Sequence, residues 1–204
     1  MKQVKLTTEA VFWNGAPLRR RNPSQALRDF HLGLLHEFYV GPEYRFSVVD
    51  DVGLACLAAT AVCLHFQRRW HGILPEQRAA VFVTYSGSLV TDLVYQKSMG
   101  AGGRSSPRVF VQTLPNMVAG QVAACYAVRG EHFVLIQDGP RSSAIAETVE
   151  MCLKYGPAKV CLVAWVEQTE TELAVELLLC YADAKDQAAG LLGSASMGRS
   201  YRMQ

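Results

Sequence analysis

The sequence predicts an α/β protein in which helices cover both faces of a mixed five-stranded sheet. An apolar run at residues 132–136 is followed by a tight turn, a helical period over residues 141–154 and another apolar run. Residues 54–70 are apolar on nearly every side of a helix, which is typical of a helix covered on both sides. Two apolar runs, 160–166 and 173–181, are joined by a short connection, and this predicts an antiparallel hairpin.

The first part of the chain adds one strand and two helices to this plan. Residues 5–14 alternate weakly between apolar and polar side chains, which predicts a first strand, and residues 19–23 predict a basic loop. Ser24 can cap a helix that runs to residue 38. Ser47 can cap the second, strongly apolar helix, with acidic residues in its first turn.

The middle of the chain supplies a strand that is buried on both faces. Residues 79–85 are β-branched and aromatic, as in a central strand, and a helix through Leu89 and Leu93 follows them. The glycine-rich residues 99–107 predict a flexible loop, and their glycines do not follow a strand in the order of a phosphate-binding loop. Residues 116–128 predict a helix, and residues 109–112 before it remain unassigned.

Composition and charge narrow the class of protein. The 204 residues are 50% hydrophobic and 19% charged, with a formal net charge of +2, so the chain can bury a sizeable core. The basic residues are dispersed apart from Arg19–Arg21, and we expect no nucleic-acid partner. The apolar stretch 52–66 is too short to cross a bilayer, and the amino terminus does not resemble a signal peptide. These features predict a cytoplasmic protein without a membrane span.

Candidate catalytic and metal-binding side chains do not occur in recognisable spacings. The six cysteines lie in apolar contexts without a C-x-x-C pair, and we expect them to be buried, including Cys125 and Cys152. His31, His36, His65 and His71 lack the spacing of metal ligands. Ser142 and Ser143 are not part of a G-x-S-x-G elbow. We therefore expect neither a metal nor another cofactor.

Two short motifs, one at residues 114–120 and one at Arg129-Gly130, together resemble a known family, the β-ketoacyl-[acyl carrier protein] synthases of the thiolase-like superfamily. Leu114-Pro115-Asn116-Met117, followed by Ala119-Gly120, resembles the family's P-N-M-x-A-G segment, and Arg129-Gly130 resembles the R-G before its nucleophile strand. Across residues 128–168 the family pattern fits without a gap and ends with Glu167. The resemblance covers residues 80–168 and implies the amino-terminal half of a thiolase-like fold, with residues 1–183 as the half-domain. We expect residues 184–204 to be a tail, helical or disordered.

The sequence departs from this family at the nucleophile. The family's acyl-accepting cysteine aligns with Gly139, within a degenerate elbow formed by Gln137, Asp138, Gly139, Pro140 and Arg141. Glycine has no side chain to act as a nucleophile. The family's catalytic histidines belong to a second half-domain, for which the sequence after Gln168 is too short. Either Arg141 closes or charges the former acyl pocket, or the two residues belong to a solvated helix start with Asp138 as its cap.

The helix after the elbow has two unlike sides. Ala144, Ile145, Thr148, Val149, Cys152 and Leu153 share one face. A polar stripe consists of Ser143, Glu147, Glu150 and Lys154. In the full-length family this helix lies between two sheets, where unpaired charges would each cost several kcal/mol. We therefore expect one side of this helix to face solvent.

The resemblance implies a catalytically silent subunit similar to a chain-length factor. Such a subunit would form a heterodimer or a higher heteromer with a full-length ketosynthase, shape its acyl tunnel and meet acyl carrier protein only indirectly, in a pathway such as that of aryl-polyene pigments. Gln137 stands two residues before the glutamine of chain-length factors. The implied contacts with the partner or its tunnel are Asn116, Met117, Val118, Gln121, Phe133, Val134 and Leu135. The alternatives are a stand-alone decarboxylase or thioesterase of low activity, or an acyl-binding protein.

Overall fold

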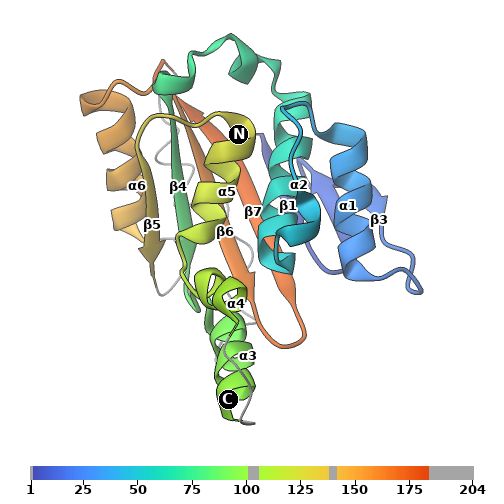
Figure 1. Ribbon diagram of the computed structural model, residues 1–204. Coiled ribbons are helices and arrows are strands. Elements are labelled where there is room, and N and C mark those ends of the chain that lie inside the picture. Colours follow the sequence, from blue (N-terminus) through green and yellow to red (C-terminus); the bar gives the residue numbers. More distant parts are fainter. Residues whose placement is uncertain (1, 101–105, 138–141, 184–204) are drawn as a thin grey trace.

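The computed structural model describes residues 2–100, 106–137 and 142–183. Their strands form a seven-stranded sheet in the order β3-β2-β1-β7-β6-β4-β5 (Figure 1). The strands are β1 (Gln3–Leu6), β2 (Ala10–Trp13), β3 (Ala16–Arg20), β4 (Arg78–Thr84), β5 (His132–Ile136), β6 (Val160–Gln168) and β7 (Leu173–Tyr181). The helices are α1 (Leu27–Phe38), α2 (Asp51–Phe66), α3 (Leu89–Gly100), α4 (Pro107–Gln112), α5 (Met117–Tyr126) and α6 (Ser143–Glu150). Shorter helical segments are η1 (Phe46–Val48), η2 (Arg68–Gly72), η3 (Pro75–Gln77) and η4 (Met151–Tyr155).

The predicted fold class is confirmed, whereas the predicted number of five strands was wrong. β4 pairs in parallel with β5 and β6, and β7 pairs antiparallel with both β6 and β1, so the sheet is mixed. The predicted hairpin of β6 and β7 is also confirmed, with Val160 opposite Tyr181 and Gln168 opposite Leu173.

The extra strands lie at the amino terminus. Residues 5–14 do not form one strand, because the Thr7 hydroxyl accepts hydrogen bonds from the N–H groups of Glu9 and Ala10, each at 3.2 Å, and closes a turn. Residues 16–20 form the edge strand β3, where a basic loop was predicted for 19–23. All five residues of β3 are exposed, so they carry no apolar alternation by which the sequence could identify a strand.

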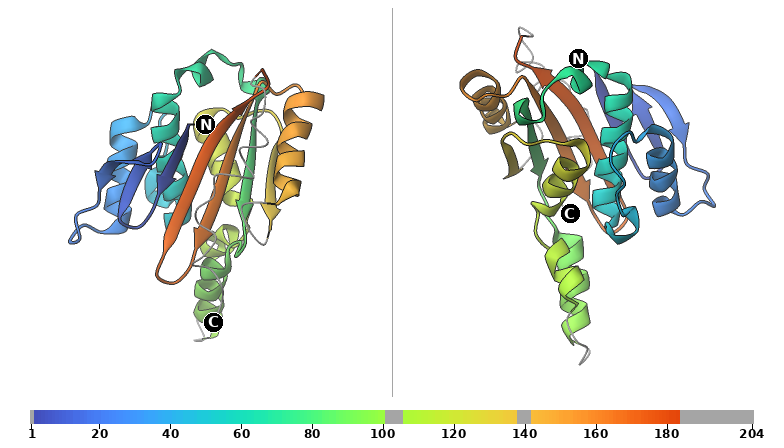
Figure 2. Two further views of the ribbon diagram at one scale, coloured as in Figure 1. Left: turned by 180° about the vertical axis from the view of Figure 1, so that it is seen from behind. Right: turned by 45° about the horizontal axis from the view of Figure 1, so that its top comes forward.

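The helices form two layers of unequal size. Helices α1, α2 and α5 cover one face of the sheet and α6 covers the other (Figure 2). Successive residues of β4 point to opposite layers: Phe82 packs with α2 and α5, whereas Val81 and Val83 pack with α6. Burial on both faces explains the continuous apolar run of β4, since neither face needs polar residues.

Helix α2 is the centre of the larger layer, and it is buried along most of its length as predicted. Its cap is Asp50, whose carboxylate accepts a hydrogen bond from the N–H of Gly53 at 2.9 Å, and not the predicted Ser47. Ser47 lies within the short helix η1 instead. Ser24 likewise does not cap α1, because its hydroxyl bonds to Asn22 and the helix begins at Leu27.

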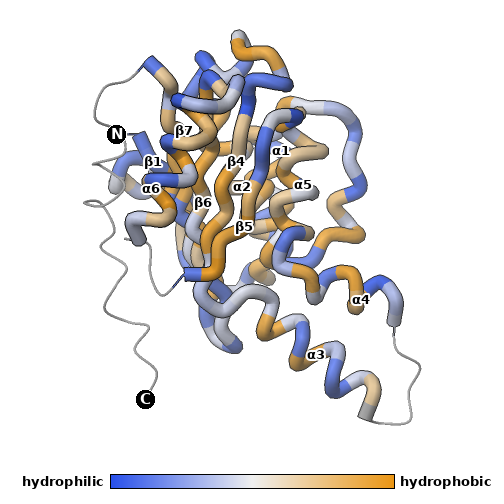
Figure 3. The backbone as a smooth tube through the Cα atoms, turned by 90° about the vertical axis from the view of Figure 1, so that its left-hand side faces the viewer, coloured by the Kyte–Doolittle hydropathy of each residue, from blue (hydrophilic) through white to orange (hydrophobic). Residues whose placement is uncertain are grey.

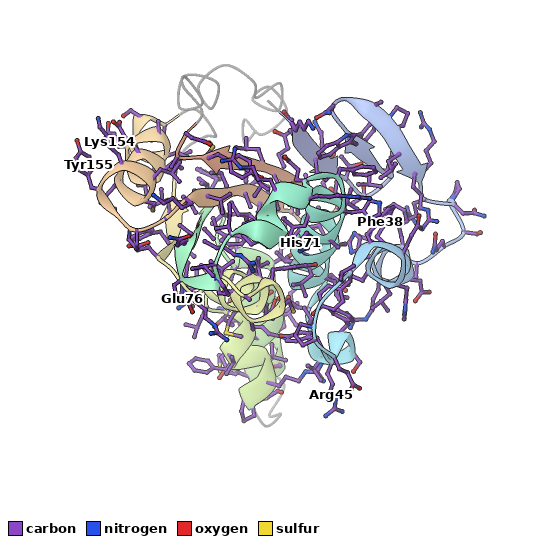
Figure 4. All side chains as sticks on the ribbon, turned by 90° about the horizontal axis from the view of Figure 1, so that it is seen from above. Phe38, Arg45, His71, Glu76, Lys154 and Tyr155 are labelled. Carbon is purple, nitrogen blue, oxygen red and sulfur yellow. The ribbon has the colours of Figure 1, made fainter. Side chains whose placement is uncertain are left out.

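The predicted two-sided character of α6 is confirmed. Ile145, Val149 and Cys152 are buried against the sheet, and the polar stripe of Ser143, Glu147, Glu150 and Lys154 is exposed. The Lys154 ammonium lies 2.9 Å from the Glu150 carboxylate. Lys154 and Tyr155 project outward at the side of the molecule (Figure 4). The charges of this helix therefore remain solvated.

Helices α3 and α4 form an arm that extends beyond the end of the sheet (Figure 1). The sequence predicted a helix from Leu89 but assigned residues 99–107 to a loop and left 109–112 open. The structure extends α3 to Gly100 and starts α4 at Pro107, with residues 101–105 outside the described part. Ser106 caps α4 by accepting a hydrogen bond from the Val109 N–H. Apolar and polar residues alternate along the arm (Figure 3).

All six cysteines are buried as free thiols, as predicted. None of the described helices is both long enough and apolar enough to cross a membrane. The expected tail at 184–204 lies outside the described residues.

Candidate functional site

A pocket opens at the carboxyl end of β4, on the face covered by α2 and α5. The space between its lining side chains, including open solvent at its mouth, amounts to about 490 Å³. Its apolar lining consists of Val52, Phe82, Val83, Leu114, Pro115, Met117, Val118, Val134 and Val166. Its polar lining consists of Asp50, Thr84, Ser88, Thr91, Gln112 and Gln168. The pocket thus combines residues that lie far apart in the sequence, from Asp50 to Gln168, with Gly87 completing its wall.

The opening lies where the connections after β4 and β5 leave the sheet on opposite faces. The segment after β4 runs through α3 and α4 to α5 on one face, whereas the segment after β5 runs to α6 on the opposite face (Figure 2). In α/β sheets, a crevice forms where neighbouring connections leave in opposite directions, and ligands commonly bind there.

Asp50 is the acidic group of the pocket. Its carboxylate caps α2 through the N–H of Gly53, and partial burial raises its pKa above the ordinary value of 3.8 because water is excluded from the charged form. The guanidinium of Arg28 binds the neighbouring Asp51 at 3.1 Å and three backbone carbonyls. The carboxylate of Asp50 in the pocket therefore accepts its hydrogen bond from a backbone N–H of α2.

Glu167 fixes the loop that forms the rim of the pocket. This carboxylate is 4% exposed and accepts hydrogen bonds from the hydroxyls of Thr84 (3.2 Å) and Ser86 (2.9 Å) and from the N–H of Tyr85. The Thr84 hydroxyl also accepts from the N–H of Gly87, whose φ of 61° favours glycine. Glu167 thus accepts hydrogen bonds from donors of this turn that would otherwise need water as their partner.

The structure brings three of the predicted contact residues together. Met117, Val118 and Val134 all line the pocket, although they come from α5 and β5. Asn116 is exposed at the start of α5. Gln121 is only 8% exposed, and its side-chain oxygen faces Gly53 of α2, so the expectation that it projects toward a partner was wrong.

The residues around β5 divide between the two faces. Phe133 and Leu135 pack on the α6 side, whereas Val134 packs on the α5 side. β5 ends the described sheet, so its outer edge lies open. Gln137 donates its N–H to the carbonyl of Thr84 at 3.0 Å, which places the start of the degenerate elbow beside the pocket rim. Asp138, Gly139, Pro140 and Arg141 lie outside the described residues.

Cys125 and Cys152 are enclosed by other side chains, and each is 2% exposed. Desolvation raises the pKa of Cys125 to about 12, whereas a hydrogen bond with the thiol of Cys161 lowers the pKa of Cys152. Within residues 2–100, 106–137 and 142–183, no three His, Cys, Asp or Glu side chains converge in a way that could hold a metal ion.

Sequence reasoning missed Asp50 and Glu167 as site residues. Glu167 entered only as the last position of the family pattern, and Asp50 only as part of the first turn of a helix. The sequence offered one signal for both: Asp50 immediately precedes the apolar helix α2, and Glu167 follows the apolar run of β6. Both ends meet the carboxyl end of β4 in the structure.

No protein-family model matches the sequence, and no curated protein matches it either. Among solved structures, the chain is similar to a chain in the complex of the ketosynthase ApeO with its chain length factor ApeC from Xenorhabdus doucetiae. The identity is 14% and the TM-score is 0.49, over 79% of this chain. The match spans 63% of the length of that chain.

Proposed function

We propose that this chain is a non-catalytic subunit, similar to a chain-length factor, that pairs with a full-length, cysteine-bearing ketosynthase and shapes its acyl tunnel. Acyl carrier protein would deliver substrate to the partner and meet this chain only indirectly. The pathway we favour is the synthesis of an aryl-polyene type of chain.

A single sequence observation carries the proposal: Gly139 occupies the position of the family's cysteine while the surrounding pattern is retained. The P-N-M segment at 115–117, Arg129-Gly130 and Glu167 all match, so the alignment at position 139 has support on both sides. Without a thiolate, the chain has no acceptor for an acyl group at this position.

The exposed surface supports a role in pairing. Large apolar side chains of the arm and its surroundings are about half exposed: Tyr85 48%, Leu89 52%, Val94 54%, Met99 47%, Phe110 51% and Leu114 45%. At the open edge of β5, Ile136 is 61% exposed. Apolar side chains gathered in this way are typical of protein–protein contacts.

The first prediction is that the purified chain takes up no acyl group from loaded acyl carrier protein. Intact-mass spectrometry after incubation measures this directly, with a cysteine-bearing ketosynthase as the positive control. Gly139→Cys alone should create no condensation activity, because the family's histidines for decarboxylation and oxyanion stabilisation are not supplied by this segment.

A stable acyl adduct on the wild-type chain would overturn the silent-subunit proposal and favour the alternative of a stand-alone decarboxylase or thioesterase. Release of free acid or carbon dioxide without an adduct would have the same consequence. Failure to form a complex with any co-expressed ketosynthase would remove the tunnel-shaping role.

A further inference from the structure

The pocket at the carboxyl end of β4 shares Met117, Val118 and Val134 with the contacts implied for a partner, but it also contains the carboxylate of Asp50, which those contacts do not use. We propose that it binds a small apolar molecule with a hydrogen-bond-donating end, a hydroxyl or an ammonium, which meets the carboxylate of Asp50. The apolar part lies between Val118 of α5 and Val134 of β5. The site is formed by this chain alone, so binding can be tested in the absence of the proposed partner.

The walls favour an apolar body for the ligand. Side chains from four elements of the larger layer and the sheet converge there: Val52 of α2, Phe82 of β4, Val118 of α5 and Val166 of β6. Phe82 and Val166 are 3% and 7% exposed, so the floor belongs to the packed core. Ligand pockets are typically lined in this way, with a few polar groups that fix orientation.

The polar groups of the lining favour a donor on the ligand, because most of the protein's own donors are already used. Ser88 donates its hydroxyl to the carbonyl of Thr113, and Thr84 donates to Glu167. Gln112 donates its amide to the carbonyl of Val48 at 3.2 Å. Asp50, in contrast, is an acceptor that binds one helix amide. A carboxylate on the ligand would meet this acid and be repelled.

The rim is preorganised, which lowers the entropic cost of binding. Glu167 holds the turn at Thr84, Tyr85 and Ser86 through the hydrogen bonds described above. The first turn of α3 follows this loop directly and contributes Thr91 to the lining.

The test compares three probes that share one alkyl chain: hexan-1-ol, hexylamine and hexanoate at pH 7. Isotope-edited NMR titrations of the full chain follow the methyl groups of Val118 and Val134. We expect saturable shifts with hexan-1-ol and hexylamine, and binding of hexanoate that is at least tenfold weaker. Asp50→Asn keeps a side chain able to cap α2 while removing the charge, and it should reduce the preference for the amine over hexanoate at least fivefold.

A matched pair of variants locates the site. Thr91→Trp places a large side chain in the lining and should weaken hexan-1-ol binding at least tenfold, whereas Gln96→Trp adds the same side chain at an exposed position of the same helix and should leave binding unchanged. Equal binding by the two variants would overturn the proposed site. Absence of saturable binding, or hexanoate binding as tightly as hexan-1-ol, would overturn the proposed ligand class.

Discussion

At the scale of single residues, His31 links the stability of the fold to pH. It is 0% exposed in α1, and neither ring nitrogen has a hydrogen-bond partner among the described residues. Desolvation lowers its pKa from 6.5 to about 4, against a smaller opposing effect of Asp51. Between these two pH values, His31 is protonated in the unfolded chain but not in the folded chain. The folded state therefore loses stability as the pH falls through this window.

We predict that the free energy of unfolding falls by about 2 kcal/mol between pH 7 and pH 5 through His31, since each pKa unit corresponds to about 1.4 kcal/mol. Denaturant titrations at the two pH values measure it. His31→Leu should lose most of this dependence, whereas His36→Leu, at an exposed position of the same helix, should keep it. An equal pH dependence of His31→Leu and the wild type would refute the assignment.

Two helical glycines give a second prediction at this scale. A Cβ at Gly53 would lie 2.1 Å from the side-chain oxygen of Gln121 and 2.8 Å from the capping carboxylate of Asp50, whereas a Cβ at Gly120 of α5 would meet nothing within 4 Å. Gly53→Ala should therefore cost about 1–3 kcal/mol through overpacking. Gly120→Ala should add about 1 kcal/mol through helix propensity. Thermal unfolding of both variants checks the opposite signs, and a stabilised Gly53→Ala would contradict the packing of α2 on α5.

At the scale of elements, the sequence predicted the helices and strands that are long and buried. It did not predict the strands that form only because a neighbouring strand pairs with them. β4, β6 and α2 were predicted because burial on all sides leaves a long apolar run, and β7 because only Glu176 interrupts its apolar run. β1 and β2 are only four residues each and were merged into one strand, since so short a segment shows no clear alternation. β3 is held by its neighbour β2 and has no apolar pattern of its own.

The candidate site follows the same rule. Met117 and Val118 could be identified because they lie in a contiguous motif. Asp50 and Glu167 could not, because their roles exist only after the sheet has brought the start of α2 and the end of β6 to the same end of β4. Gln121 was misplaced because the facing direction of a helix residue depends on which neighbour covers it, and here that neighbour is α2.

At the scale of the whole molecule, the sheet has an open edge at β5 that is suited to pairing. The carbonyl of Glu131 accepts from the Ala80 N–H and the N–H of Gln137 donates to Thr84, each at 3.0 Å, so the odd-numbered residues direct their backbone groups toward β4. Because these directions alternate along a strand, the backbone groups of His132, Val134 and Ile136 point outward. An edge of this kind, beside the exposed apolar arm, favours association with another chain.

We predict that the chain expressed alone forms homodimers or aggregates, and that co-expression with a full-length ketosynthase gives a 1:1 complex, as measured by light scattering.

Ile136→Pro removes one outward N–H donor at an exposed position of β5 and should weaken association at least tenfold. Ile136→Ala retains this N–H, so it measures the loss of the apolar side chain alone. A wild-type chain that stays monomeric at micromolar concentration would contradict pairing altogether. Association of both variants that is as tight as that of the wild type would instead assign the contact to the arm, where Leu89, Val94 and Phe110 are among the exposed apolar side chains.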